Sequence, residues 1–257
     1  MKLIHNFKSP NFNDRKSNNI EIIVIHYTSL SSISNSLKYL CSKKNKVSSH
    51  YLISQAGTIY SLVSEKKRAW HAGQSYWRGN TDINSISIGI ELDYSPLDLN
   101  NKFSFRLNSA LIFLLKKLKK KYKIRTENIL GHSDIAPYRK VDPGRHFPWN
   151  TLENRQLSYK VQFINKSNLD KNLINKWFDK NKFNSMRKKI LFMLNFIGYD
   201  VSLALKNKNY FDQLIEAYFN HYKIYKDYYY NKKKIFDVIE LHFLNIILTK
   251  NQKQLKS

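Results

Sequence analysis

The run Ile22-Ile23-Val24-Ile25, which His26 follows directly, decides the fold of the first half of this 257-residue chain. Four β-branched residues in succession predict a buried strand, because such side chains pack well on a pleated surface. We therefore place His26 at the end of a buried strand.

Further helix and strand signals follow this run, up to about residue 155. Residues 109–121 place Leu111, Leu114 and Leu118 on one face and lysines on the other, as in an amphipathic helix. Ala56-Gly57 has the composition of a hairpin turn. The other expected elements are a short helix at 34–42, hairpin strands at 49–54 and 58–63, a strand at 85–92 that ends near Glu91, and a short strand at 129–130.

The second half indicates helices joined by Asn- and Lys-rich turns, since it has a single Gly and no Pro after Pro148. Gly198 occupies a helix C-cap position, and Tyr199 is placed to pack back against that helix. We expect the change in composition near 155–165 to separate two domains, at 1–157 and 158–257. Apolar stripes predict helices at 185–197, 210–221 and 235–249.

The chain is strongly basic: 44 Lys and Arg against 19 Asp and Glu give a formal charge of +25. Such a surplus favours anionic partners, namely nucleic acid, anionic lipid or an acidic cell-wall polymer. Only 9 of the basic residues are Arg, the residue that suits base recognition, and the charge is spread over both halves. Codon drift in an AT-rich genome is the stronger explanation, so we expect no specific nucleic-acid partner.

Cys41 is the single cysteine, so no disulfide forms within the chain. The N-terminal residues lack the hydrophobic segment of a signal peptide, and no stretch approaches the length of a membrane span. These features predict a cytoplasmic protein by default, without a transmembrane segment, and we expect a monomer. Export or a periplasmic location by a non-classical route stays open.

Two histidines and one aspartate stand where a metal site can form. His26 and His132 each follow a predicted strand, and Asp142 lies in a loop that Pro137 and Pro143 restrict. Three N and O ligands with an open fourth position are typical of catalytic zinc, and the same set can hold ferrous iron in an oxygenase. On the residues alone, both metals stay open.

Six motifs occur in an order that resembles a known family, the type 2 N-acetylmuramoyl-L-alanine amidases, which are zinc hydrolases of the AmpD and AmiD kind. The resemblance covers residues 20–150, and the run 75–91 is closer to the AmiD branch. The motifs are Ile25-His26-Tyr27-Thr28, Ser48-Ser49-His50-Tyr51, Trp70-His71-Ala72-Gly73, Ser87-Ile88-Gly89-Ile90-Glu91, Gly131-His132-Ser133-Asp134-Ile135-Ala136-Pro137 and Arg139-Lys140-Val141-Asp142-Pro143-Gly144.

The resemblance implies an α/β fold with a central mixed β-sheet flanked by helices, and one zinc ion per chain held by His26, His132 and Asp142. It also implies Glu91 as the general base and Lys140 as the partner for negative charge that develops on the substrate. The expected activity of this bacterial hydrolase is cleavage of the amide between the lactyl group of N-acetylmuramic acid and L-alanine of the stem peptide, in peptidoglycan or anhydro-muropeptides. Such hydrolysis at neutral pH needs an activated water and a carboxylate that moves its proton.

A non-catalytic peptidoglycan-recognition protein on the same fold is the alternative. Such proteins usually lack a metal ligand, and none is missing here. Residues 158–257 resemble, more weakly, the small three-helix peptidoglycan-binding domain that follows the catalytic domain in AmiD-like enzymes. The residues that carry this resemblance are Phe196-Ile197-Gly198-Tyr199-Asp200 and Ile215-Glu216-Ala217-Tyr218-Phe219-Asn220-His221.

Several side chains between the motifs are expected to bind substrate. Aromatic residues there can lie under a sugar or a peptide, and an arginine can bind a carboxylate. Packing within a loop explains the same residues equally well, so that alternative stays open. The candidates are Trp70, His71, Tyr76, Trp77, Arg78 and Asn84. We expect His50 to be structural, and we do not expect His146 to be a metal ligand.

Tyr138 and the pair Arg145-His146 depart from the family's pattern. Tyr138 stands where the family usually has Gly, so a positive φ there would strain the tyrosine or require a rebuilt loop. Both departures lie beside Asp142. We therefore expect them to affect substrate preference rather than catalysis.

Overall fold

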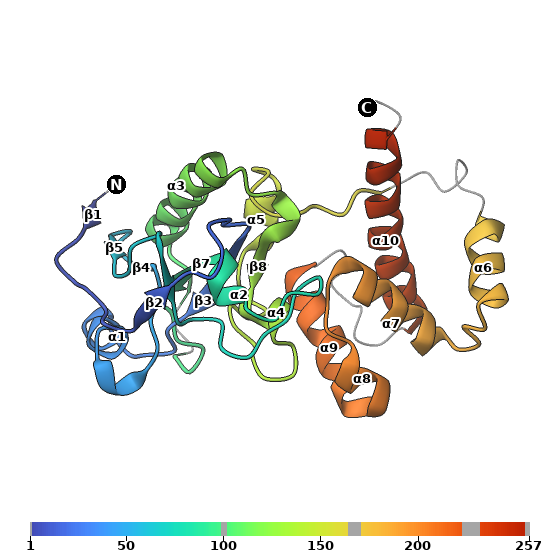
Figure 1. Ribbon diagram of the computed structural model, residues 1–257, viewed down its shortest axis with the longest axis horizontal. Coiled ribbons are helices and arrows are strands. Elements are labelled where there is room, and N and C mark those ends of the chain that lie inside the picture. The colour runs from blue at the N-terminus through green and yellow to red at the C-terminus, as the bar shows by residue number, and fades with distance from the viewer. Residues whose placement is uncertain (1, 99–101, 164–170, 223–231, 255–257) are drawn as a thin grey trace.

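A computed structural model describes residues 2–98, 102–163, 171–222 and 232–254 of the chain (Figure 1). Its centre is a six-stranded mixed sheet, which confirms the expected fold class. The strand order is β1-β5-β4-β7-β3-β8, and β3 lies between β7 and β8, parallel to both. The strands are β1 (Leu3–Ile4), β3 (Ile22–Tyr27), β4 (Tyr51–Ile53), β5 (Ile59–Ser61), β7 (Ser87–Leu92) and β8 (Ile129–Gly131).

The two faces of the sheet are covered by different helices. Ile23 and Ile25 of β3 pack in one apolar cluster with the buried leucines of α3 (Phe105–Tyr122). Ile22 and Val24 point to the opposite face and belong to a second cluster. His26 follows in the same alternation, so its side chain lies on the face of Val24.

Shorter elements complete the first half. The hairpin of β4 and β5 is confirmed, and β2 (Phe12–Asp14) pairs with β6 (Lys67–Ala69) in a separate two-stranded sheet. The strand expected from residue 85 begins only at Ser87, because α2 (Ile83–Ile86) occupies the preceding turn. The other short elements are α1 (Ile33–Leu40), η1 (Lys43–Asn45), η2 (Thr126–Asn128), α4 (His132–Ile135) and α5 (Trp149–Glu153).

The second half is helical, as expected. The Ser185 hydroxyl accepts a hydrogen bond from the Lys188 N–H at the start of α7, and Gly198 ends that helix with a φ of 144°. Two helices, α6 and α8, were not expected from the sequence. The helices are α6 (Lys171–Lys180), α7 (Met186–Ile197), α8 (Ser202–Lys206), α9 (Lys208–His221) and α10 (Lys232–Gln254).

The helical region packs against the sheet face that carries Ile22 and Val24. Figure 1 shows α4 between the sheet and α9, and α4 contacts both β3 and α9. One apolar cluster includes Leu130 and Ile135 of the first half together with Leu194 and Tyr218 of the second. The division at residue 157 and a role of the helices in wall binding stay predictions.

Among the described residues, no helix combines the length and apolar character that crossing a bilayer requires. The compartment and the monomeric state stay predictions.

Candidate metal centre

The three predicted ligands converge on one point. His26 Nδ1 lies 3.0 Å from His132 Nδ1, and each of these nitrogens lies 3.1 Å from Asp142 Oδ2. All three side chains are buried, with exposed fractions of 1%, 3% and 7%. Three potential ligand atoms therefore line a single buried point without any intervening side chain.

Parallel strand pairing brings the two histidines together. β3 and β8 are hydrogen-bonded neighbours, with Ile25 opposite Gly131, so the residues that follow these two positions leave the same edge of the sheet. Asp142 is attached to this edge because the Ser133 N–H donates to its carbonyl at 2.9 Å. Gly131 permits the approach, since a Cβ there would lie 2.6 Å from Pro143 Cδ.

The donor set fits a divalent cation. Ligand atoms 2.0–2.1 Å from a tetrahedral zinc ion are about 3.3 Å apart, close to the separations of 3.0 and 3.1 Å found here. Burial and the neighbouring His132 lower the pKa of His26 to about 4. Burial opposes ionisation of Asp142, but the two imidazoles outweigh it and hold the pKa of this carboxyl well below its usual value. At neutral pH His26 and Asp142 therefore have the protonation states that metal ligands need.

Outer hydrogen bonds hold the nitrogens of the two histidines that point away from the site. His132 Nε2 lies 3.0 Å from the Ala72 carbonyl, which can only accept, so Nδ1 keeps its lone pair. His26 Nε2 lies 3.0 Å from His71 Nδ1, and His71 Nε2 lies 3.1 Å from Ser87 Oγ. When this chain runs as donors from His26 Nε2 through His71 Nε2 to Ser87 Oγ, His26 Nδ1 keeps its lone pair for a metal. His71 is therefore a buried partner of His26, and its contact with a substrate stays a prediction that these bonds do not support.

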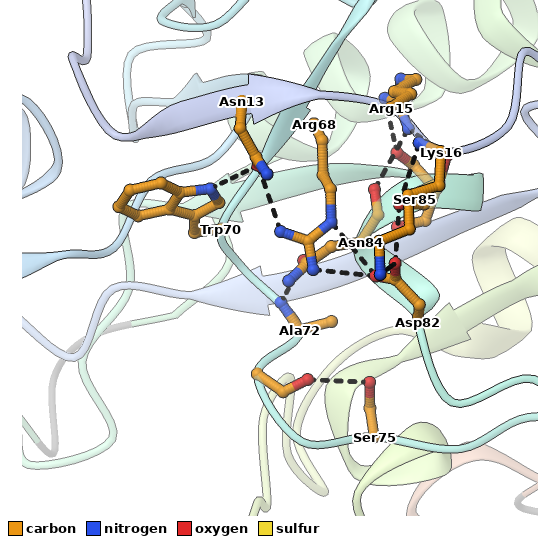
Figure 2. Close-up of polar contacts among 12 residues, drawn as sticks. Asn13, Arg15, Lys16, Arg68, Trp70, Ala72, Ser75, Asp82, Asn84 and Ser85 are labelled. Carbon is orange, nitrogen blue, oxygen red and sulfur yellow. Dashed lines mark hydrogen bonds and ion pairs between the residues drawn. The ribbon is translucent and has the colours of Figure 1, made fainter.

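Asn84 holds the backbone of the segment that supports both histidines. Its Oδ1 accepts from the N–H groups of His71 at 3.1 Å and Ala72 at 2.9 Å. Figure 2 shows it beside the Arg68–Asp82 ion pair, above the segment that leads from Ala72 to Ser75. With 6% of its surface exposed, Asn84 acts as a scaffold residue. Its contact with a substrate stays a prediction that these bonds do not support.

Glu91 faces the same site from the adjacent strand. It lies opposite His26 in the register of β3 and β7, and neighbours in register share a face of the sheet. The side chain is 9% exposed, and its Oε2 has no hydrogen-bond partner among the described residues. Burial and, secondarily, Asp142 raise the pKa of Glu91 to about 8, while Lys140 opposes this shift. A buried, unpartnered carboxyl of this kind is suited to taking and giving a proton near neutral pH.

Lys140 and Tyr27 complete the polar surroundings. Lys140 is half-buried, and its charge lowers the pKa of both His26 and Glu91, so it lies close to the centre. Tyr27 was not singled out in the sequence, although it follows His26 directly. Burial and the charge of Asp142 raise its pKa to about 12, and its ring lies 5.6 Å from that of Tyr94.

A cavity of about 430 Å³ opens on the side of Tyr94, and His146 belongs to its lining. His146 is exposed and is absent from the group of side chains that can hold a metal among the described residues. His50 is fully buried, and its Nδ1 accepts from the Gly89 N–H at 3.0 Å, as a structural residue would.

The remaining substrate candidates lie at two different places. The indole N–H of Trp70 donates to Asn13 Oδ1 at 2.8 Å (Figure 2), and Tyr76 lines a cavity of about 410 Å³ beside α8 and α9. Trp77 is 2% exposed and packs edge-on against Tyr199, while Arg78 Nε donates to the Ile197 carbonyl at 2.9 Å. These contacts give Trp77 and Arg78 a packing role against the helical region. Substrate contact stays a prediction for all four residues, and the contacts of Trp77 and Arg78 do not support it.

Tyr138 does not have the positive φ that would strain a tyrosine at this position. It is absent from the described residues with positive φ. Its hydroxyl donates to the Asp200 carbonyl at 2.6 Å, and its ring packs edge-on against Tyr210. The larger side chain therefore attaches the metal loop to the helical region. Arg145 and His146 are exposed beside that loop.

Known proteins resemble this chain in sequence and in structure. The chain is 42% identical to the N-acetylmuramoyl-L-alanine amidase AmiD of Escherichia coli over 146 residues, which are 52% of this chain and 52% of the relative. It is 41% identical over 105 residues to the 1,6-anhydro-N-acetylmuramyl-L-alanine amidase AmpD of Haemophilus influenzae, covering 40% of this chain and 55% of the relative. The chain thus spans about half the length of the curated relatives it matches.

Solved structures match over a longer part of the chain. The E. coli AmiD structure in complex with the substrate anhydro-N-acetylmuramic acid-L-Ala-D-gamma-Glu-L-Lys has a TM-score of 0.71 and 29% identity, covering 91% of this chain and 93% of that one. The structure of AmpDh3 from Pseudomonas aeruginosa has a TM-score of 0.70 and 27% identity, covering 86% and 91%. Residues 16–145 match the family described as N-acetylmuramoyl-L-alanine amidase. On this match, the chain belongs to the N-acetylmuramoyl-L-alanine amidase family.

Proposed function

We propose that the protein is a zinc-dependent N-acetylmuramoyl-L-alanine amidase. It hydrolyses the amide between the lactyl group of N-acetylmuramic acid and L-alanine of the stem peptide, in peptidoglycan or in anhydro-muropeptides. The observation that carries the proposal is the juxtaposition of a complete His26, His132 and Asp142 ligand group with the buried, unpartnered carboxyl of Glu91. Membership of the amidase family selects the substrate bond.

Zinc is the metal of this proposal, since two neutral imidazoles and one carboxylate with an open position form a catalytic zinc site. When bound, zinc supplies Lewis acidity, which polarises the scissile carbonyl and makes a water molecule easier to deprotonate. His26, His132 and Asp142 hold it. His71 and the Ala72 carbonyl contact the Nε2 atoms of the two imidazoles and so hold the rings with Nδ1 toward the metal.

Glu91 moves the proton. Its carboxylate takes a proton from the attacking water and delivers it to the nitrogen of the leaving L-alanine. Burial raises the pKa of Glu91 to about 8, which favours the step in which the protonated carboxyl delivers its proton to the amine. The ammonium group of Lys140 stabilises the negative charge that develops on the carbonyl oxygen.

A non-catalytic recognition protein would need none of this proton chemistry. A carboxyl that is nine-tenths buried and lacks a partner costs folding free energy, so its presence beside a complete ligand group favours an enzyme. The structures of E. coli AmiD and of P. aeruginosa AmpDh3 have been solved in complex with a tripeptide and with a pentapeptide of anhydromuramic acid. These molecules are therefore the first substrates to try.

The test is mass spectrometry of products from an anhydromuramyl tripeptide and from intact sacculi. Zinc-loaded protein should release the free stem peptide, a chelator should stop the release, and added zinc should restore it. The His132→Ala variant should lose both zinc and activity. Activity that survives chelation or His132→Ala would overturn the proposed mechanism.

A further inference from the structure

Asp134 is a fully buried carboxylate two residues after the ligand His132. Three donors satisfy it. Its Oδ2 accepts from the Gly131 N–H and from His221 Nδ1, each at 2.7 Å, and its Oδ1 accepts from the Tyr199 hydroxyl at 2.5 Å. The proposed chemistry uses none of these three contacts.

Two of the three donors come from the helical region. Tyr199 follows the end of α7, and His221 is the last residue of α9. They stand 65 and 87 residues from Asp134 in sequence. The helical region is thus bonded directly to the segment that carries His132 and, through the bond from Ser133 to the Asp142 carbonyl, to a second ligand.

His221 is itself held on every side. Its ring stacks on Trp149 with centroids 3.6 Å apart and on Tyr222 at 4.1 Å, and its Nε2 lies 2.9 Å from Ser158 Oγ. Ser158, His221 and Asp134 are connected in the order of a hydrolytic triad. The exposed fractions of 2%, 1% and 0% exclude a substrate from the hydroxyl, so this group is structural.

The segment needs such support because it is short. α4 comprises only His132–Ile135, and a single turn of helix is not stable by itself in water. Asp134 reaches back to the N–H of Gly131 and closes that turn. Loss of a donor would leave a buried carboxylate short of a partner, which forces the turn to rearrange or take up water.

We propose that Tyr199 and His221 are positioning residues of the metal centre: through Asp134 they hold α4 so that His132 and Asp142 face His26. The metal centre is that of the proposed function, on which this inference rests. The helical region is accordingly a part of the catalytic unit, whatever else it binds. Outer-shell contacts of this kind typically change metal affinity 10- to 100-fold.

Two buried tyrosines provide a matched comparison. Tyr199 and Tyr218 are both 0% exposed. Among the described residues, the hydroxyl of Tyr199 bonds to Asp134 and that of Tyr218 bonds to His242 Nδ1. Tyr199→Phe and Tyr218→Phe therefore remove the same group from the same kind of environment. Zinc affinity is measured on the full chain by competition with a chromophoric chelator, and the cobalt-substituted protein gives an absorption spectrum that reports ligand geometry.

Tyr199→Phe should weaken zinc binding roughly 10-fold or more and shift the cobalt spectrum, because Asp134 loses a donor that holds α4 and its ligand His132 in place. Tyr218→Phe should leave both within about twofold. A second pair separates positioning from folding: His221→Asn retains a donor at the place of Nδ1, whereas His221→Leu retains bulk without a donor. The Asn variant should keep more zinc affinity than the Leu variant at comparable thermal stability.

Equal zinc affinity and identical cobalt spectra in Tyr199→Phe and Tyr218→Phe would overturn the inference. These readouts do not depend on turnover. A protein that binds zinc with the expected order among the variants but cleaves no muropeptide would refute the proposed function and leave the positioning role standing.

Discussion

Gly89→Ala is expected to damage the metal centre without touching a ligand. Gly89 lies in β7, opposite Val24, and a Cβ at this position would lie 2.4 Å from Cγ and 2.6 Å from Cδ2 of His71. Carbon atoms in contact are ordinarily about 3.5–4.0 Å apart, so the overlap exceeds about 1 Å. The methyl group and the imidazole cannot both keep these positions.

The ring of His71 has little freedom to move away. It is 5% exposed, and its two nitrogens contact His26 Nε2 and Ser87 Oγ. Overpacking of such a site typically costs 1–3 kcal/mol of stability, and disturbing the partner of a metal-bound histidine typically weakens metal binding 10- to 100-fold. We expect both losses in Gly89→Ala, because the displaced ring no longer fixes the orientation of His26.

Urea unfolding of the metal-free protein and zinc competition titrations measure the two effects separately. The control is the double variant Gly89→Ala/His71→Ala, in which the ring that the methyl group strikes is absent. In the His71→Ala background, Gly89→Ala should lower the unfolding free energy less than it does in the wild type. The zinc affinity of the double variant should stay at the level of His71→Ala. Wild-type stability and zinc affinity in Gly89→Ala would refute the argument from the His26–His71 contact.

Three further outcomes follow from the same geometry. Asn84→Ala should lower the unfolding free energy by about 1–3 kcal/mol and weaken zinc binding, since two buried N–H groups lose their acceptor. Chemical denaturation and chelator competition measure the two effects, and unchanged values would contradict the scaffold role. Zinc at 100 times its Kd should raise the unfolding free energy by about 2.7 kcal/mol, measured as a zinc-dependent Tm that Asp142→Ala abolishes. Burial and the nearby Arg15 lower the pKa of His50 to about 3, below the 6.5 of an unfolded chain. The unfolded state therefore binds the proton more readily, and the unfolding free energy falls as pH drops below about 6.5. The slope for this group is at most about 1.4 kcal/mol per pH unit. His50→Asn should reduce that slope in urea titrations between pH 7 and 5.

The ligand group could be predicted because local signals mark each member. His26 and His132 directly follow short apolar strands, and Asp142 lies between two prolines, so sequence alone made them candidates. Family resemblance then supplied their common role. The parallel pairing of β3 with β8, which no local pattern encodes, is the physical reason that residues 106 apart lie 3.0 Å from one another.

Local sequence signals do not identify the residues that support the metal ligands. Asp134 stands within a recognised motif, but its donors Tyr199 and His221 come from the helical region, whose packing depends on the whole fold. Trp77 was expected among the substrate contacts, but it is buried against Tyr199. The sequence could not distinguish the two cases, because an exposed and a buried aromatic residue in a loop have the same local pattern. The turn of α2 was missed since a four-residue helix has no measurable periodicity.

The comparison of zinc-loaded wild-type protein with zinc-loaded Glu91→Ala tests the central claim most directly. Both proteins should contain one zinc per chain, because Glu91 is not a ligand. Mass spectrometry of an anhydromuramyl tripeptide should show cleavage at the lactyl–L-alanine amide by the wild type and a turnover lower by roughly 10²–10⁴-fold in the variant, the usual contribution of a general base. Equal turnover of the two zinc-loaded proteins, or no cleavage by the wild type, would contradict the account.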